Sequence, residues 1–78
     1  MHLDIITPEK KLFSGEVTSV KVPGTMGEFQ VLKNHAPIIS SLGKGKVTVK
    51  SSEGVKTFDV RSGVIEVLKN NVIVLAES

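Results

Sequence analysis

The chain has 78 residues, no cysteine and a formal net charge of +2 at pH 7. A chain this short forms one small domain, residues 1–78, that buries only about 60% of its unfolded surface. The composition excludes a disulfide framework and a thiolate metal site, and the slight charge argues against nucleic-acid binding. We recognise no signal peptide and no run approaching the roughly 18 apolar residues of a membrane span.

Apolar and polar residues alternate through the first half of the chain, which predicts strands and no amphipathic helix. Pro8 ends the first strand because proline cannot donate to a ladder. Ser14-Gly15 predicts a bend or bulge, and the turn residues at positions 23–27 separate two further strands. The strands expected here cover residues 3–7, 17–22, 29–32 and 38–42.

The second half contains the clearest hairpins. Residues 46–50 alternate, the chain turns at 51–54, and 55–61 return. Residues 64–68 and 72–76 form a last hairpin around Lys69-Asn70-Asn71, because asparagine tolerates the left-handed backbone of a tight turn. Short strands with frequent turns predict an all-β fold, a flattened antiparallel β-barrel or sandwich of two sheets.

The run Gly43-Lys44-Gly45-Lys46 invites comparison with a phosphate-binding loop. A P-loop requires a glycine five residues before its Gly-Lys pair and a serine or threonine after it. This chain has Ile38 and Gly45 at those positions. We therefore interpret these glycines as turn residues and expect no cofactor.

His35 is the candidate for a catalytic base. A catalytic set would need Ser40 or Ser41 beside it and a carboxylate behind it, and no motif supports that arrangement. We interpret His35 as a loop residue that hydrogen-bonds the backbone or a partner, and we expect no catalytic residue. One usable histidine and scattered carboxylates also lack the spacing of a metal site.

The segment 27–38 predicts a binding module instead. Lys33 to His35 form a polar loop between two strands, and loops on a rigid scaffold commonly carry function. Glu28 follows Met26-Gly27, and its carboxylate is interpreted either as a solvated turn residue or as a charge offered to a basic partner. An alternative is a small nucleic-acid- or ligand-binding β-barrel that uses Lys44, Lys46 and Lys50 beside Phe58.

The sequence contains three informative blocks, HLDIITPEKKLFSGEV (2–17), PGTMGEFQVLKNHAPI (23–38) and GVIEVLKNNVIVLAES (63–78). From end to end it resembles the N-terminal β-sandwich domain of the epsilon subunit of F-type ATP synthases. The tetrapeptide NHAP (34–37) after a Gly-Glu turn is the most specific part of the match.

The resemblance implies a non-catalytic subunit of the rotary central stalk that couples ion-driven rotation to ATP synthesis. It implies a domain that sits against the gamma subunit and rests on the polar loops of the membrane c-ring. The protein would then be peripheral at the cytoplasmic face of the cell membrane, which it reaches only through the ring. It would belong to a hetero-oligomer in the complex and be a monomer alone.

The resemblance also implies roles for individual positions. Glu28 would pair with a basic residue of the ring loop. The positions near gamma would be Thr7, His35 and Ser40, and the ring-facing positions would be Met26, Gly27, Glu28, Phe29, Lys33, Asn34 and His35.

Two departures from the family pattern affect these expectations. Lys33 replaces a usual proline and Gln30 replaces a frequent glycine, so we expect a less rigid loop and a more charge-dependent ring contact. The C-terminal helical hairpin that usually follows is missing after Ser78. No inhibitory role or regulatory ATP site is assigned.

Overall fold

Nine β-strands and no helix make up the computed structural model, which describes residues 1–78. The all-β class predicted from the periodicity is confirmed. The structure contains no helix with the length and hydropathy of a membrane span. The strands are β1 (His2–Ile6), β2 (Lys11–Glu16), β3 (Ser19–Gly24), β4 (Gly27–Leu32), β5 (Ile38–Leu42), β6 (Gly45–Ser51), β7 (Gly54–Val60), β8 (Ser62–Leu68) and β9 (Asn71–Glu77).

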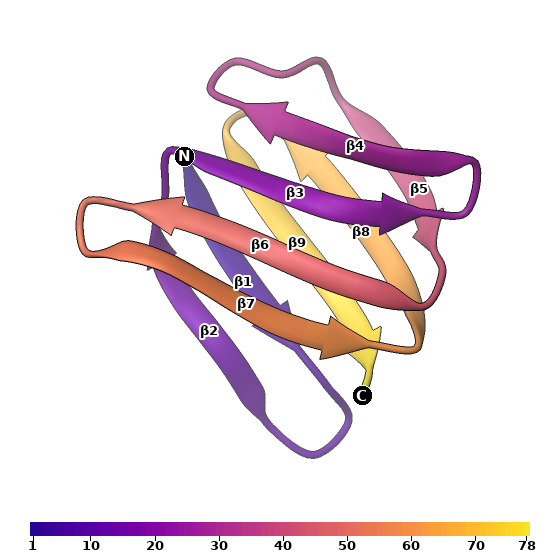
Figure 1. Cartoon of the computed structure of the whole chain (residues 1–78). Helices are drawn as coiled ribbons and strands as arrows, with labels where there is room; N and C mark the ends of the chain where they lie inside the picture. The colour runs from indigo at the N-terminus through magenta and orange to yellow at the C-terminus, as the bar shows by residue number, and fades with distance from the viewer.

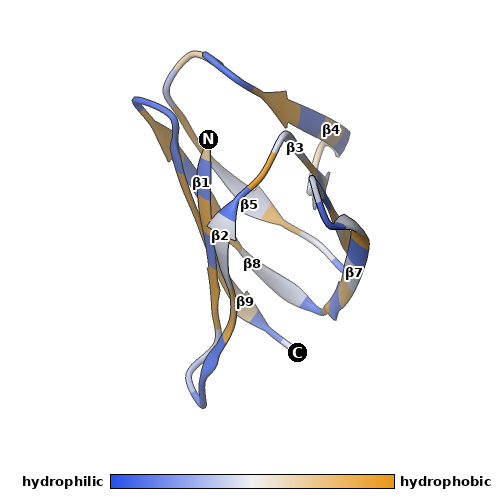
Figure 2. Cartoon of the chain, turned by 90° about the vertical axis from the view of Figure 1, so that its left-hand side faces the viewer, coloured by the Kyte–Doolittle hydropathy of each residue, from blue (hydrophilic) through white to orange (hydrophobic).

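The strands form two layers that meet at one corner (Figure 1). One layer has the order β2-β1-β9-β8-β5 and the other the order β4-β3-β6-β7. The pair Gly24 and Leu42 joins β3 to β5 and makes the corner continuous. Figure 2 shows the layers from the side, with β1, β2 and β9 facing β3, β4 and β7. The predicted sandwich of two sheets is therefore observed as one curled sheet.

The pairing between β1 and β9 departs from the expected antiparallel pattern, because these two strands run parallel. His2 lies opposite Asn71 and Ile6 lies opposite Leu75. A parallel pair cannot be closed by a hairpin and needs a long connection, which here is the whole of the intervening chain. The first and last strands therefore lie side by side in the interior of one layer.

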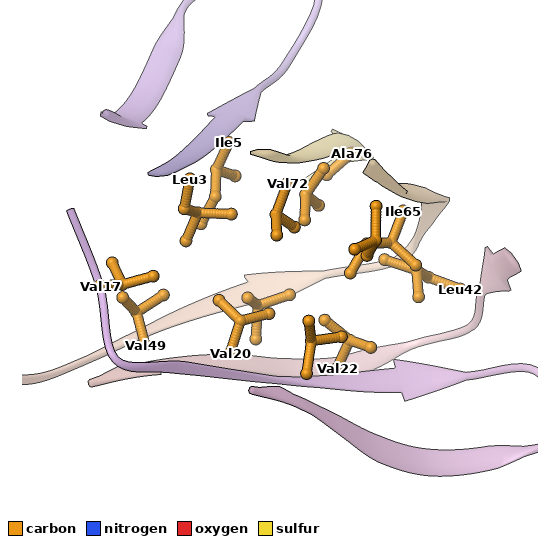
Figure 3. Close-up of a cluster of buried hydrophobic side chains, with 14 of the residues drawn as sticks. Leu3, Ile5, Val17, Val20, Val22, Leu42, Val49, Ile65, Val72 and Ala76 are labelled. Atoms are coloured by element: carbon orange, nitrogen blue, oxygen red, sulfur yellow. The ribbon is translucent and has the colours of Figure 1, made fainter. Parts of the chain in front are cut away.

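The core lies between the layers and is entirely aliphatic (Figure 3). Burying a side chain such as Leu3 or Ile65 contributes about 1.5–3 kcal/mol, and the half-buried aromatic rings pack around the margin of this core. The buried apolar residues are Leu3, Ile5, Val17, Val20, Val22, Val31, Leu42, Val47, Val49, Val60, Ile65, Val67, Val72, Val74 and Ala76.

The strand boundaries differ from the sequence expectation mainly near the N-terminus. The bend expected at Ser14-Gly15 lies inside β2, where Gly15 pairs with Leu3; the register shift falls instead between Ile5 and Ile6 of β1. Val17 precedes β3 rather than beginning it, yet it is buried. Because β2 pairs only with β1, it can take up this irregularity, which leaves Leu12 between the pairs Ile5–Phe13 and Ile6–Lys11.

Candidate functional site: two partner-binding surfaces

The first predicted segment, Met26 to Phe29, lies at the β3–β4 turn. Met26 is 99% exposed, and Gly27 adopts a φ of 130° that L-residues avoid. Phe29 points the other way and packs against the core. A Cβ on Gly24 would lie 2.8 Å from the Phe29 ring, so glycine there lets the ring close under the turn. The turn therefore displays Met26 and Glu28 on a base that Phe29 fixes.

Glu28 is already paired inside the domain. Its Oε1 lies 3.6 Å from Nζ of Lys21 on the neighbouring strand, and both side chains are about half exposed. An exposed pair of this kind is worth about 0–1 kcal/mol. A basic partner can therefore compete with Lys21 for the Glu28 carboxylate at small cost.

The second predicted segment, Lys33 to His35, lies in the β4–β5 loop. Asn34 has a φ of 66°, and the N–H of His35 donates to the carbonyl of Leu32 at 3.1 Å. Nδ1 of the His35 ring lies 2.7 Å from the carbonyl oxygen of Ala36. Because a carbonyl only accepts, Nδ1 carries the proton in this contact. No serine or carboxylate contacts the ring, so the structure assembles no catalytic set around it.

The two segments lie at opposite ends of β4, an edge strand that pairs only with β3 (Figure 1). A strand of this length separates its ends by about 17 Å. Gln30 and Leu32 are exposed between them, on the face of the strand opposite Val31. The residues predicted to face the ring therefore lie at the two ends of one edge strand rather than in a single patch.

The positions matched to gamma contacts are not brought together. Thr7 is buried, and its hydroxyl donates to the carbonyl of Lys10 at 2.9 Å while accepting from the Lys10 N–H. Ser40 is half-buried in β5, and His35 lies in the loop before that strand. β9 and β8 separate β1 from β5, which is about 14 Å across three strand spacings. The contact of these residues with gamma stays a prediction.

An apolar outer face is the surface that the sequence interpretation missed. It covers β5, β8 and β9 on the side away from the core. The register places Ile39 beside Glu66 and Glu66 beside Ile73, while Val64 lies beside Leu75. The exposed fractions are 73% for Ile39, 52% for Leu75, 51% for Leu68, 39% for Val64 and 36% for Ile73.

A sequence signal for this face exists. β8 reads SGVIEVL and β9 reads NVIVLAE, so apolar residues point to both sides of each strand. A half-exposed strand would alternate, whereas continuous apolar runs are typical of strands covered on both faces. The outer face of β8 and β9 therefore has the composition of a covered face, yet its apolar side chains are exposed in this structure.

One carboxylate interrupts the apolar outer face and another borders it. Glu66 makes no ion pair, while Asp4 on β1 lies opposite Ile73. The pKa of Asp4 is below its ordinary value of 3.8, mainly because of the Ser14 hydroxyl on the next strand, with Lys11 adding positive charge. Oδ1 of Asp4 nevertheless lacks a hydrogen bond of normal length and has Nζ of Lys11 at 3.7 Å.

A second carboxyl with a lowered pKa belongs to Glu16, at the end of β2 and opposite the start of β1. The pKa of Glu16 is below its ordinary value of 4.5 because it accepts a hydrogen bond from the chain's terminal ammonium group, whose charge and that of His2 add to the effect. The Glu16 Oε1 lies 3.2 Å from that nitrogen. These contacts occupy the polar end of the β1–β2 pair.

The alternative of a nucleic-acid-binding barrel is not supported by the geometry. Nζ of Lys46 is paired with Asp59 at 2.8 Å, and the Phe58 ring packs on Phe13. A single-strand binder needs free cations beside aromatic rings that bases can stack on. No group of three histidine, cysteine, aspartate or glutamate side chains could hold a metal ion.

The fold and these surfaces define a small all-β domain that presents an apolar face and polar loops for contact with other molecules.

 The sequence matches the profile of the ATP synthase Delta/Epsilon chain beta-sandwich domain over residues 1–78, and the chain belongs to this family. Members of the family are non-catalytic subunits of the ATP synthase complex, so this chain is not an enzyme by itself.

Similar curated proteins carry the same description. The chain is 46% identical to the ATP synthase epsilon chain of Caulobacter vibrioides, over 99% of this chain and 90% of that protein. It is 49% identical to the epsilon chain of Chlorobaculum tepidum, over 96% of this chain and 86% of that one. It is 42% identical to the longer epsilon chain of Leptospira borgpetersenii, of which it spans 61%.

Solved structures share the fold. The chain superimposes on a chain of the Tetrahymena thermophila mitochondrial ATP synthase central stalk and c-ring with a TM-score of 0.88 at 14% identity, covering 100% of this chain and 63% of that chain. It superimposes on a chain of the Euglena gracilis mitochondrial ATP synthase with a TM-score of 0.89 at 19% identity, covering 97% and 49%. At these identities the likeness concerns the fold alone.

Proposed function

We propose that this domain bridges the gamma subunit and the c-ring in the rotor of an ATP synthase and so couples ion-driven rotation to ATP synthesis. The observation that carries the proposal is the separation of two unlike surfaces on one rigid body. The apolar outer face lies on one layer, and the polar edge strand β4 lies on the other. A domain that must hold two different neighbours at once needs such a division.

The apolar outer face is the proposed contact with gamma. Apolar side chains in the centre of an interface supply most of its affinity, whereas exposed ion pairs at its rim add about 0–1 kcal/mol each. Ile39 and Leu75, with more than half of each side chain exposed, are the proposed anchors. Glu66, which lies between Ile39 and Ile73 on the same face, would accept a hydrogen bond from a basic side chain of the partner.

The β4 edge is the proposed contact with the c-ring. Met26 and Glu28 lie at one end of this edge and Lys33 to His35 lie at the other. Their polar groups suit the polar loops that close the helices of a membrane ring. On this proposal the chain is peripheral at the cytoplasmic face of the cell membrane and reaches the membrane only through the ring.

The close packing of the aliphatic core supports a coupling role. Protein interiors are packed as densely as organic crystals and deform little under load. A curled sheet with a continuous corner at Gly24 and Leu42 should therefore transmit torque between its two surfaces without shearing.

The test is reconstitution with each partner separately. The purified chain should bind gamma at micromolar concentration and, in a second assay, bind the detergent-solubilised ring, while hydrolysing no ATP. Binding to neither partner would overturn the proposal. Binding to gamma alone would remove the bridging role and leave an accessory subunit of the head.

A further inference from the structure

The β4–β5 loop and the β8–β9 turn are joined by a reciprocal pair of asparagines, which are 36 positions apart. The backbone N–H of Asn34 donates to Oδ1 of Asn70 at 2.8 Å. Nδ2 of Asn70 donates back to Oδ1 of Asn34 at 3.1 Å. Both residues adopt the left-handed backbone, with φ of 66° and 62°, which asparagine tolerates better than most residues.

This asparagine clamp connects the β4–β5 loop, which crosses between the layers, to the β8–β9 turn of the layer that contains β1. The loop runs from β4 in one layer to β5 in the other. Apart from the clamp, it is held by a hydrogen bond from the His35 N–H to the carbonyl of Leu32 at the end of β4. Asn70 is held more firmly, because its carbonyl accepts from the N–H of His2 at 2.9 Å at the start of β1. The clamp therefore fixes the loop to the central β1–β9 pair.

Both side-chain oxygens of the clamp are used as acceptors, and the charged side chains beside the clamp are donors. Oδ1 of Asn34 and Oδ1 of Asn70 are both engaged as acceptors inside the clamp. Lys33 and Lys69, the neighbours of the two asparagines, are exposed and make no ion pair within the domain. A surface of free N–H donors fits a partner that offers carbonyl or carboxylate oxygens.

We propose that the β8–β9 turn is a second part of the surface that binds the ring, that Asn70 positions the Lys33–His35 loop within it, and that the surface takes an acceptor-rich polar loop. This inference rests on the proposed function, since it deepens the ring contact. It assigns to Asn70 and Lys69 a role that neither the sequence interpretation nor the family comparison gives them.

The variant that tests the positioning role is Asn70→Gly. Glycine keeps the left-handed backbone of the turn and removes only the amide, so the hairpin should still form. We expect binding to the purified ring to weaken about tenfold, which corresponds to about 1.4 kcal/mol. Asn71→Ala is the matched control, because the Asn71 amide reaches only the Lys69 carbonyl, at 3.4 Å.

Amide hydrogen exchange separates positioning from general destabilisation. In Asn70→Gly the Asn34 amide should exchange at least tenfold faster while amides of the core strands, such as those of Ile65 and Val74, keep their protection. Faster exchange throughout the core would show a structural role and overturn the positioning role. Unchanged exchange at Asn34 would show that the clamp does not hold the loop.

Lysine variants test the kind of partner. Lys69→Ala should weaken ring binding several-fold in low salt and by less in high salt, whereas Lys44→Ala, at the far end of β5, should have no effect. If Asn70→Gly or Lys69→Ala binds the ring as well as the unmodified chain does, this inference is overturned and the proposed function stands. Failure of the unmodified chain itself to bind the ring would overturn both.

Discussion

Phe13 and Phe58 meet edge to face across the side of the domain where the two layers share no strand pairing, with ring centroids 6.2 Å apart. Phe13 lies on the edge strand β2 and Phe58 on the edge strand β7. Nζ of Lys56 lies 5.7 Å from the centre of the Phe13 ring. The side opposite the Gly24–Leu42 corner is therefore closed by side chains rather than by backbone hydrogen bonds.

We predict that Phe58→Ala lowers the free energy of unfolding by about 2 kcal/mol, somewhat less than for a fully buried phenylalanine. The loss is large for a domain of this size, whose total stability should be about 4–12 kcal/mol. Urea unfolding followed by circular dichroism measures it, with Val55→Ala on the same strand as the exposed control. In a double-mutant cycle with Phe13→Ala, a coupling energy near zero would contradict a direct ring contact.

Gly24→Ala should destabilise the β3–β4 turn by about 1–3 kcal/mol, because the new methyl group has no room. Its Cβ would lie 2.7 Å from the carbonyl oxygen of Gly27 and 2.8 Å from the Phe29 ring. Gly43→Ala is the matched control, since the nearest atom to its Cβ is 3.9 Å away. The melting temperatures of both variants test this prediction. Equal melting temperatures would mean that the Phe29 ring and the Gly27 carbonyl group both move aside at no cost.

Leu75→Lys should abolish gamma binding at micromolar concentration while leaving the domain folded. Leu75 is 52% exposed on the apolar outer face, so the charge is tolerated in the free domain but desolvated in the complex. Val55→Lys, at a position 60% exposed on β7, is the control and should bind gamma normally. The check is a gamma titration of both variants beside their melting curves. Normal binding by Leu75→Lys would move the gamma contact to another surface.

Glu28→Lys should weaken ring docking at least tenfold and gamma binding little, because the reversed charge repels the basic residue of the ring that is expected to face this end of β4. Lys21→Met is the informative partner variant: it frees Glu28 from its contact at 3.6 Å and should leave docking unchanged or strengthen it. Both substitutions should change unfolding free energy by less than about 1 kcal/mol, because the pair is exposed. Parallel titrations with the ring and with gamma test whether the two partners bind separate surfaces. An equal loss of affinity for both partners would contradict this.

Acid should weaken the domain partly through Asp4, whose pKa is depressed below its ordinary value of 3.8 by the Ser14 hydroxyl and by Lys11. A carboxyl with a lower pKa in the folded state stabilises it above the unfolded pKa, and that contribution is lost as pH falls through the folded pKa. Asp4→Asn should therefore melt below the unmodified protein at neutral pH, with the difference shrinking below pH 3.8. Melting temperatures across this range, at low and high salt, measure it. A difference independent of pH would point to packing instead.

Much of the fold follows from the sequence because its signals are local. Pro8, the turn residues at 23–27 and Asn70 act on their own backbone, and period-2 alternation identifies strands such as β6 without reference to any partner. The Met26–Phe29 turn and the Lys33–His35 loop could be placed as displayed segments for the same reason. Their assignment to an ATP synthase surface came from the resemblance of whole blocks, not from the chemistry of any one residue.

Only the tertiary structure shows the relationships between residues that are far apart in the chain. The parallel pairing of β1 with β9, the contact of Lys21 with Glu28 and the clamp between Asn34 and Asn70 all depend on how strands are ordered. Alternation tells which residues share a face of one strand, but not which strand lies beside it or which face is covered. The sequence therefore determined an all-β binding domain and its family, while the packing of the layers determined where its surfaces lie and what holds them.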